Sequence, residues 1–266
     1  MDRRGFLTLA GSCLAVPAAW GAGPLAPLNG LAAAINKSGR QRMLSQRTAK
    51  AWAMLVLGVL PERAKLILNQ SIALFEQQLA ELGTLLPSDE LRGLHLQLEH
   101  EWGRFRPLLA DIRSNGQAVW SGSEAVLGAA HKLTLAYERA YAKPAGRLVN
   151  VSGRQRMLSQ RMAKAYLFRR LGVLPGPAGE MLEQAMSEFA RAHEELKAPR
   201  PGAGQIQAGL ALVEQQWYFF RNALTLRDSG NQDKAAADVA TTSERILEEM
   251  ELIVGLYERA AREGEA

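Results

Sequence analysis

Two stretches of the chain carry the same set of basic and small polar residues. The decapeptide SGRQRMLSQR occurs at 38–47 and again at 152–161. Each copy holds three arginines beside serine, glycine and glutamine. An arginine side chain donates paired hydrogen bonds to a planar oxyanion and stays charged at any physiological pH. The motif therefore predicts the binding of an anion.

No acidic residue lies near either copy. Between Asp2 and Glu62 the chain has no Asp or Glu, and between Glu138 and Glu180 it has none either. Among the cations in these two gaps are, around the first copy, Lys37, Arg40, Arg42, Arg47 and Lys50, and around the second, Arg154, Arg156, Arg161, Lys164, Arg169 and Arg170. Their partners must come from other helices or from a ligand.

The spacing separates the arginines of each copy onto different helix faces. Successive residues of an α-helix turn by about 100°, so Arg42 points nearly opposite to Arg40, which shares a face with Arg47. Apart from one glutamine, the neighbours on the Arg42 face are small and would let another helix approach closely. The candidate ligand-binding residues are Arg42, Arg156, Gly39, Gly153, Ser38, Ser152, Ser45, Ser159, Gln46 and Gln160. The secondary basic residues are Arg40, Arg47, Arg154 and Arg161.

Packing the two motif helices against each other would bring Arg42 and Arg156 face to face. At about 7 Å and an effective dielectric near 20, two such charges repel by about 2 kcal/mol. An anion at about 4 Å from each would regain about 4 kcal/mol per contact before its desolvation is counted. The sequence therefore predicts a seam that is strained when empty and relaxed when it holds an anion.

Other kinds of chemistry find little support. The four histidines are at no metal-ligand spacing, no Glu-x-x-His pair exists for a di-iron site, and Cys13 is the sole cysteine. We see no catalytic triad, phosphate loop or haem-attachment motif, so we expect no enzyme, no metal and no cofactor. The tryptophans, with Phe105, Phe219 and Phe220, are predicted to be core residues rather than a cofactor site.

The motif belongs to a duplication that covers most of the chain. Residues 35–61 align with 149–175 without a gap, 114 positions apart, with 19 identities in 27 positions. The register slips by one at Trp102 and Trp217, and further where SEAVLGAAHKLTLAYERA (123–140) aligns with SERILEEMELIVGLYERA (243–260). We predict one repeat at 28–142 and another at 147–262, each the size of a small domain.

Hydrophobic residues recur at helical spacing in four segments of each repeat. In the first repeat the expected helices cover about 31–60, 62–86, 90–114 and 121–143, with Ser88 or Asp89 capping the third and Ser123 and Glu124 capping the fourth. The second repeat predicts helices near 147–172, 177–197, 203–228 and 232–262. No useful stretch alternates with period two, so the predicted fold class is all-α.

Short turns between four amphipathic helices predict an up-down-up-down bundle, whose first and last helices end at the same pole. The fourth helix of one repeat can then connect to the first helix of the next through a short link at 143–146. We therefore expect two tandem four-helix bundles, side by side and related by a pseudo-twofold axis, like a parallel homodimer made of one chain.

The N-terminus is typical of an export signal. Arg3 and Arg4 precede an uncharged run and then small residues, a pattern that resembles the twin-arginine type. We place the signal at 1–22 and expect an exported, periplasmic protein without a stable membrane span, since the apolar run is too short to cross about 30 Å of bilayer. Export makes nucleic acid an improbable partner despite the net charge of +5.

The stretches INKSGRQRMLSQRTAKA and VNVSGRQRMLSQRMAKA resemble the first-helix motif of the N-terminal domain of type IV pilus chemotaxis transducers, the PilJ-like domain. The same region is similar to the periplasmic domain of nitrate/nitrite sensor kinases. In those sensors an arginine from each of two helices holds nitrate at a dimer interface. The resemblance implies that role for Arg42 and Arg156, and nitrate or nitrite as the ligand. The sensors also carry membrane helices and cytoplasmic signalling modules, and we expect neither in this chain.

Two hypotheses follow. In the first, the protein is a periplasmic sensory or accessory protein that holds a small oxyanion between the first helices of its repeats and reports it to a membrane sensor. In the second, it is a non-catalytic module whose basic seam or outer face docks a pilus, chemotaxis or sensor-kinase partner. A simpler interpretation of the arginines applies to either hypothesis: they form a basic helix face that is solvated or paired with acids from other helices, such as Glu76, Glu81 or Glu188.

Overall fold

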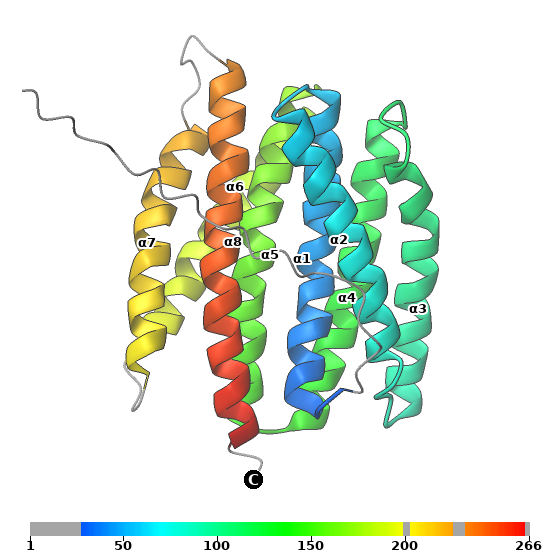
Figure 1. Ribbon diagram of the computed structural model, residues 1–266, viewed down its shortest axis with the longest axis vertical. Coiled ribbons are helices and arrows are strands. Elements are labelled where there is room, and N and C mark those ends of the chain that lie inside the picture. Colours follow the sequence, from blue (N-terminus) through cyan, green and yellow to red (C-terminus); the bar gives the residue numbers. More distant parts are fainter. Residues whose placement is uncertain (1–27, 199–202, 226–231, 264–266) are drawn as a thin grey trace, which may run out of the picture.

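The computed structural model describes residues 28–198, 203–225 and 232–263, and its secondary structure within these ranges is entirely helical (Figure 1). The first repeat contains α1 (Leu31–Val56), α2 (Pro61–Leu82), α3 (Asp89–Phe105), the 3-10 helix η1 (Arg106–Leu109) and α4 (Gly116–Tyr141). The second contains α5 (Pro144–Arg170), α6 (Pro175–Lys197), α7 (Gly204–Thr225) and α8 (Gln232–Glu263). The all-α prediction is confirmed. The predicted export signal lies outside the described residues.

The helices of each repeat form a bundle, and the two bundles lie side by side. Helix α1 packs against α2 and α4 while α3 packs against α4, and the second repeat repeats this pattern with α5, α6, α8 and α7. The most extensive helix–helix contact joins α1 to α5 at the centre of the molecule, where both run in the same direction (Figure 1). This arrangement confirms the predicted pair of four-helix bundles, and the two motif helices form the seam between them.

The sequence LGVLP makes the same turn after both motif helices. Gly58 and Gly172 have φ angles of 68° and 71°, a left-handed conformation that glycine adopts without steric cost. The amide of the next residue, Val59 or Val173, then donates to a carbonyl five residues back in its helix, at 2.9 and 3.0 Å. A proline begins the following helix, where its missing amide hydrogen costs nothing.

The third and fourth helices of the first repeat differ from the predicted ones. Ser88 caps α3 as expected, since its Oγ accepts from the Leu91 amide at 3.2 Å. The prediction that this helix runs to residue 114 was wrong, because α3 ends before Pro107 and continues only as η1. Helix α4 begins earlier than predicted, capped by Asn115, so the predicted caps at its start were also wrong and Ser123 lies buried inside the helix.

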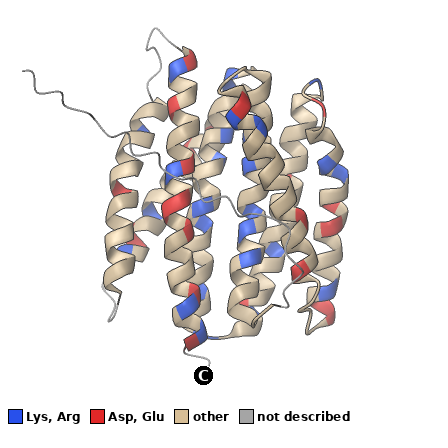
Figure 2. Cartoon of the chain, in the orientation of Figure 1, with Lys and Arg blue, Asp and Glu red and all other residues tan. Residues whose placement is uncertain are grey.

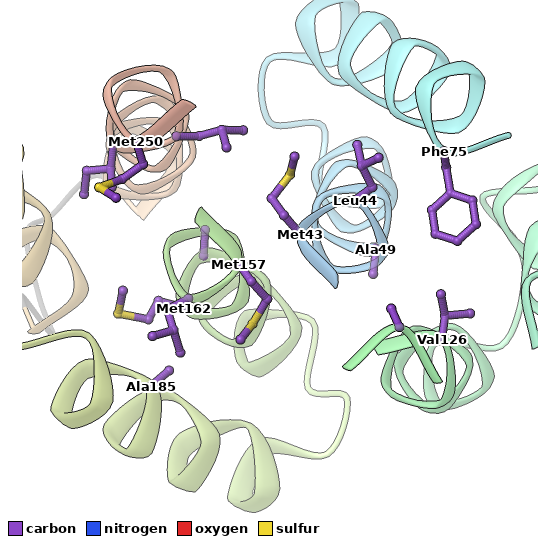
Figure 3. Close-up of a cluster of buried hydrophobic side chains, with 14 of the residues drawn as sticks. Met43, Leu44, Ala49, Phe75, Val126, Met157, Met162, Ala185 and Met250 are labelled. Carbon is purple, nitrogen blue, oxygen red and sulfur yellow. The ribbon is translucent and has the colours of Figure 1, made fainter. Parts of the chain in front are cut away.

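Aromatic and aliphatic side chains form one core that runs through both bundles. Phe75 stacks on Trp102 with ring centroids 3.8 Å apart, and Phe189 meets Trp217 at 4.6 Å in the second repeat. Figure 3 shows Met43 and Met157 lying between α1 and α5, so the core is continuous across the seam. The prediction of core positions was wrong for Phe219, which is 62% exposed on α7.

No helix within the described ranges combines the length and apolar character needed to cross a bilayer.

Candidate functional site

The motif helices carry the basic side chains to the middle of the molecule. Figure 2 shows Lys and Arg concentrated along α1 and α5, with acidic residues on the helices around them. Arg42 and Arg156 have no exposed surface and are among the largest fully buried side chains of the described residues. A buried guanidinium is costly unless it is paired or hydrogen-bonded, so the contacts of these two groups determine the chemistry of the seam.

The two guanidinium groups converge above a pair of glycines. A Cβ atom on Gly39 would lie 3.1 Å from Nη2 of Arg42 and 3.8 Å from Nη2 of Arg156. On Gly153 the same two distances occur with the arginines exchanged. Both side chains therefore meet at one place on the pseudo-twofold axis, and glycine leaves room for them at both positions.

Each arginine is held by an asparagine of the opposite motif helix. Nη2 of Arg42 donates to Oδ1 of Asn150 at 2.7 Å, and Nη2 of Arg156 donates to Oδ1 of Asn36 at 2.8 Å. The side-chain amides of the asparagines donate in turn to glutamates near the ends of α4 and α8, Asn150 to Glu138 and Asn36 to Glu258, the latter at 2.5 Å. These crossed bonds tie α1 to α5.

The remaining partners of the two arginines differ. Nη1 of Arg156 forms a salt bridge with Glu251 at 2.8 Å, whereas Nη1 of Arg42 lies 3.3 Å from Nδ1 of His131. Among the described residues no carboxylate lies within salt-bridge distance of Arg42. Since a guanidinium only donates, the histidine nitrogen must accept, which requires a neutral ring.

The electrostatics follow from these partners. Burial, together with the charges of Arg154 and Arg156, lowers the pKa of Arg42 to about 9. Burial also lowers the pKa of Arg156, to about 10, although Glu251 opposes the shift. Burial and the cations Arg42 and Arg154 lower the pKa of His131 to about 4. The positive charge of Arg42 is therefore the less compensated of the two.

One nitrogen of each arginine has no hydrogen-bond partner. Nε of Arg42 and Nε of Arg156 are buried and unpaired among the described residues. A buried donor without an acceptor costs about 1–3 kcal/mol. The seam thus contains two donors whose hydrogen-bonding capacity the protein itself does not satisfy.

The serines and glutamines of the motif contact the protein rather than an open space. Ser45 and Ser159 donate to backbone carbonyls of their own helices at 2.8 Å, and Ser38 and Ser152 do the same at 3.2 Å or less. Gln46 and Gln160 donate to the backbone carbonyls of residues 123 and 243, at 3.1 and 2.9 Å. All six side chains are buried, and they permit the close approach of helices.

The secondary basic residues are all paired with carboxylates. Arg47 and the fully buried Lys50 share Glu244, each with a closest contact of 2.5 Å. Arg161 and the fully buried Lys164 share Glu124, at 2.7 and 2.6 Å. The other two pairs are Arg40 with Glu251 and Arg154 with Glu188. These four arginines are therefore paired with acids from other helices, as the simpler interpretation expects, and Glu188 is one of the acids it named.

A cavity of about 250 Å³ opens beside His131. Helices α4, α5 and α6 line it, and its polar lining residues are Glu124, His131, Arg154, Arg161, Gln184 and Glu188. His131 separates Arg42 from this cavity, because it contacts the guanidinium on one side and lines the cavity on another.

The sequence analysis did not predict several residues of the site as site residues. They are Asn36, Asn150, His131, Glu251, Glu124, Glu244, Lys50 and Lys164. A signal existed for most of them. Both asparagines and both lysines recur at the 114-residue spacing of the motif. The alignment of the last helices places Glu124 opposite Glu244, and His131 opposite Glu251.

The family model of the type IV pili methyl-accepting chemotaxis transducer N-terminal domain (PilJ) matches the chain twice, at residues 25–127 and 139–244. No curated protein and no solved structure matches the chain. The two matches correspond to the two copies of the motif and to the two bundles, so the tandem duplication is confirmed. Together they span well over half of the chain, and the chain therefore belongs to the PilJ family, with two copies of its sensory domain in one polypeptide.

Proposed function

We propose that this protein is an exported, periplasmic sensory or accessory protein that binds a small oxyanion, with nitrate or nitrite favoured, at the seam between α1 and α5. The family supplies the sensory role and partners of the chemotaxis or pilus type. The seam itself favours an anion, because two buried guanidinium groups meet there and, among the described residues, Glu251 is the one carboxylate in direct contact with either of them.

The observation that carries the proposal is the incomplete neutralisation of Arg42. Its partners are neutral, namely the carbonyl oxygens of Asn150 and the ring nitrogen of His131. No atom of the part of the chain that the structure describes accepts from its Nε. An oxyanion would supply both the missing acceptor and the missing charge, and a charge-assisted hydrogen bond of this kind is about twice as strong as a neutral one.

Calorimetric titration of the full chain tests the proposal. Nitrate, nitrite, sulfate and chloride are compared at constant ionic strength. We expect nitrate or nitrite to bind at about one per chain, with an affinity that falls as salt is added. Binding disappears in the double variant Arg42→Ala plus Arg156→Ala. If none of the anions binds, or if the double variant binds as well as the parent, the proposal is wrong.

Two further variants test whether the double variant loses binding only because it no longer folds. Arg42→Lys keeps the charge but loses the planar fork, so it should weaken nitrate binding while circular dichroism still reports the helical fold. Arg113→Ala removes an arginine whose side chain is 87% exposed far from the motif in sequence, and nitrate binding should be unchanged.

A second function has its own observation. Leu212, Tyr218 and Phe219 on α7 and Leu252 on α8 are between 48% and 67% exposed. Large apolar side chains at a surface are typical of protein contacts. If the protein is a docking module, it would bind its partner through these exposed apolar residues. Their substitution should then abolish partner binding without any effect on anion binding.

A further inference from the structure

The two sides of the seam correspond residue by residue. The motif helices match at a spacing of 114, and the last helices of the repeats match at a spacing of 120, which places His131 on α4 opposite Glu251 on α8. Arg42 and Arg154 on one side therefore correspond to Arg156 and Arg40 on the other. The contacts of Glu251 on α8 can therefore be compared directly with those of His131 on α4.

On the α8 side a carboxylate bridges the two cations. Glu251 accepts from Nε and Nη2 of Arg40 at 3.0 and 2.6 Å, and from Nη1 of Arg156 at 2.8 Å. The contact with Arg40 is bidentate, the geometry in which a guanidinium binds a planar carboxylate most strongly. Glu251 thus neutralises one arginine from each motif helix.

On the α4 side the same place holds the ring of His131. It offers Arg42 a neutral acceptor at 3.3 Å, and Arg154 donates instead to Glu188 on α6. Burial and the charges of Arg154 and Arg156 lower the pKa of Arg42, although Glu138 and Glu188 oppose the shift without contacting the guanidinium.

The cavity beside His131 lies next to this place, with the His131 ring between the cavity and Arg42. Its volume of about 250 Å³ exceeds the share of about 30 Å³ that one water molecule takes in the liquid. The acids that line it already have partners, since Glu124 binds Arg161 and Lys164, and Glu188 binds Arg154. An anion entering the cavity would meet the neutral edge of His131, with Arg42 behind it.

We propose that a small planar oxyanion or carboxylate enters through this cavity, displaces the ring of His131 and takes, between Arg42 and Arg154, the place that the Glu251 carboxylate takes between Arg156 and Arg40. The inference rests on the proposed function and specifies which half of the seam holds the ligand. On the α8 side of the seam, the Glu251 carboxylate then occupies the position that the ligand takes on the α4 side. Because the template is a carboxylate, nitrate, nitrite and acetate fit the site better than tetrahedral sulfate.

A matched pair of variants tests the location of the site. Arg154→Ala and Arg40→Ala remove corresponding residues, and only the first should matter. We expect calorimetry with nitrate and with acetate to show at least about a tenfold loss of affinity in Arg154→Ala, against less than about twofold in Arg40→Ala, because only Arg154 contacts the ligand. Equal losses in the two variants would place the anion on the axis and overturn the inference.

A second pair of variants tests whether a carboxylate at position 131 can take the place of the ligand. His131→Glu supplies on α4 the group that Glu251 supplies on α8, so it should abolish nitrate binding and raise the thermal midpoint. His131→Gln keeps a neutral acceptor for Arg42 and should retain binding within about threefold. Undiminished nitrate binding by His131→Glu would contradict the inference while leaving the proposed function intact. Failure of the unaltered chain to bind any of the anions would overturn both.

Discussion

The two sides of the α1–α5 seam share one motif but neutralise its central arginine differently. On the α8 side, Arg156 and Arg40 are bridged by Glu251, and although burial alone would raise the pKa of this carboxyl, the two cations lower it to about 2. On the α4 side, Arg42 faces a neutral histidine. The duplication thus places the same cations on both sides, while a single position on the last helix decides whether a carboxylate of the protein contacts the central arginine.

The largest expected effect concerns the buried ion pairs that support both sides. Glu244→Gln leaves Arg47 and the fully buried Lys50 without their carboxylate, which should cost about 3–5 kcal/mol of unfolding free energy. Glu124→Gln makes the corresponding change on the other side. Its cost should be smaller, because the Glu124 side chain is 26% exposed and that of Glu244 is 6% exposed. Urea unfolding measures both, and a larger loss in Glu124→Gln would refute this ranking.

The next largest effect concerns Glu251 and His131, the residues that differ between the two sides of the seam. Glu251→Gln leaves Arg156 buried without a counter-charge and should cost about 2–4 kcal/mol of unfolding free energy. His131→Gln replaces one neutral acceptor by another and should cost less than about 1 kcal/mol. Thermal unfolding of the two variants provides the measurement. Similar costs would mean that Arg42 and Arg156 are neutralised in equivalent ways.

The two sides should also respond to acid at different pH. Burial and nearby cations lower the pKa of His131 from 6.5 to about 4, so the unfolded chain takes up the proton first as the pH falls. Its contribution to stability is complete above pH 6.5 and is lost towards pH 4. The pKa of Glu251 falls from 4.5 to about 2, so its contribution is complete above pH 4.5 and is lost towards pH 2.

Urea unfolding between pH 8 and pH 3 distinguishes the two windows. The unaltered chain should lose stability between pH 6.5 and pH 4 more steeply than His131→Gln does. Glu251→Gln should keep the steeper fall in that window and lose sensitivity only below pH 4.5. Identical slopes for the chain and His131→Gln between pH 6.5 and pH 4 would show that His131 is not held neutral by Arg42.

The smallest effect lies away from the seam. Phe219→Ser removes an aromatic side chain that is 62% exposed, so the unfolding free energy should change by no more than about 0.5 kcal/mol and nitrate binding should stay the same. A loss of more than about 1 kcal/mol in urea unfolding would indicate that the surface of α7 is covered within the protein.

The fold was largely predictable because its signals are local or repeated. Helical spacing of apolar residues, the LGVLP turns and the exact repetition of the motif indicate the helices and the duplication. The limits of α3 and α4 were not predicted correctly, because Pro107 ends a helix whose apolar pattern continues, and Asn115 is a cap that the pattern treats as a break. Phe219 belongs to the same aromatic cluster in sequence as Phe220, and only the packing of α7 separates them.

The candidate site was predictable in its central residues but not in their partners. The small residues around Arg42 indicate a close helix contact, and the duplication indicates which helix supplies it. Besides the asparagines of the motif helices, the partners of these arginines are His131 on α4 and Glu251 on α8. These last helices align at a spacing of 120 residues, whereas the motif helices align at 114. Spacing within one repeat does not reveal that Glu251 and His131 face the seam, because this depends on how the two bundles pack together.

The most direct measurement is the NMR signal of the arginine Nε–H groups in the full chain, recorded with and without nitrate. Arg42→Lys and Arg156→Lys assign the two buried signals. We predict that nitrate shifts the Arg42 signal strongly and slows its exchange with water, and that the Arg156 signal moves less. Both Nε groups lack an acceptor among the described residues, but only Arg156 is already paired with a carboxylate, Glu251. A nitrate titration that leaves both signals in place, or moves Arg156 more than Arg42, would contradict this prediction.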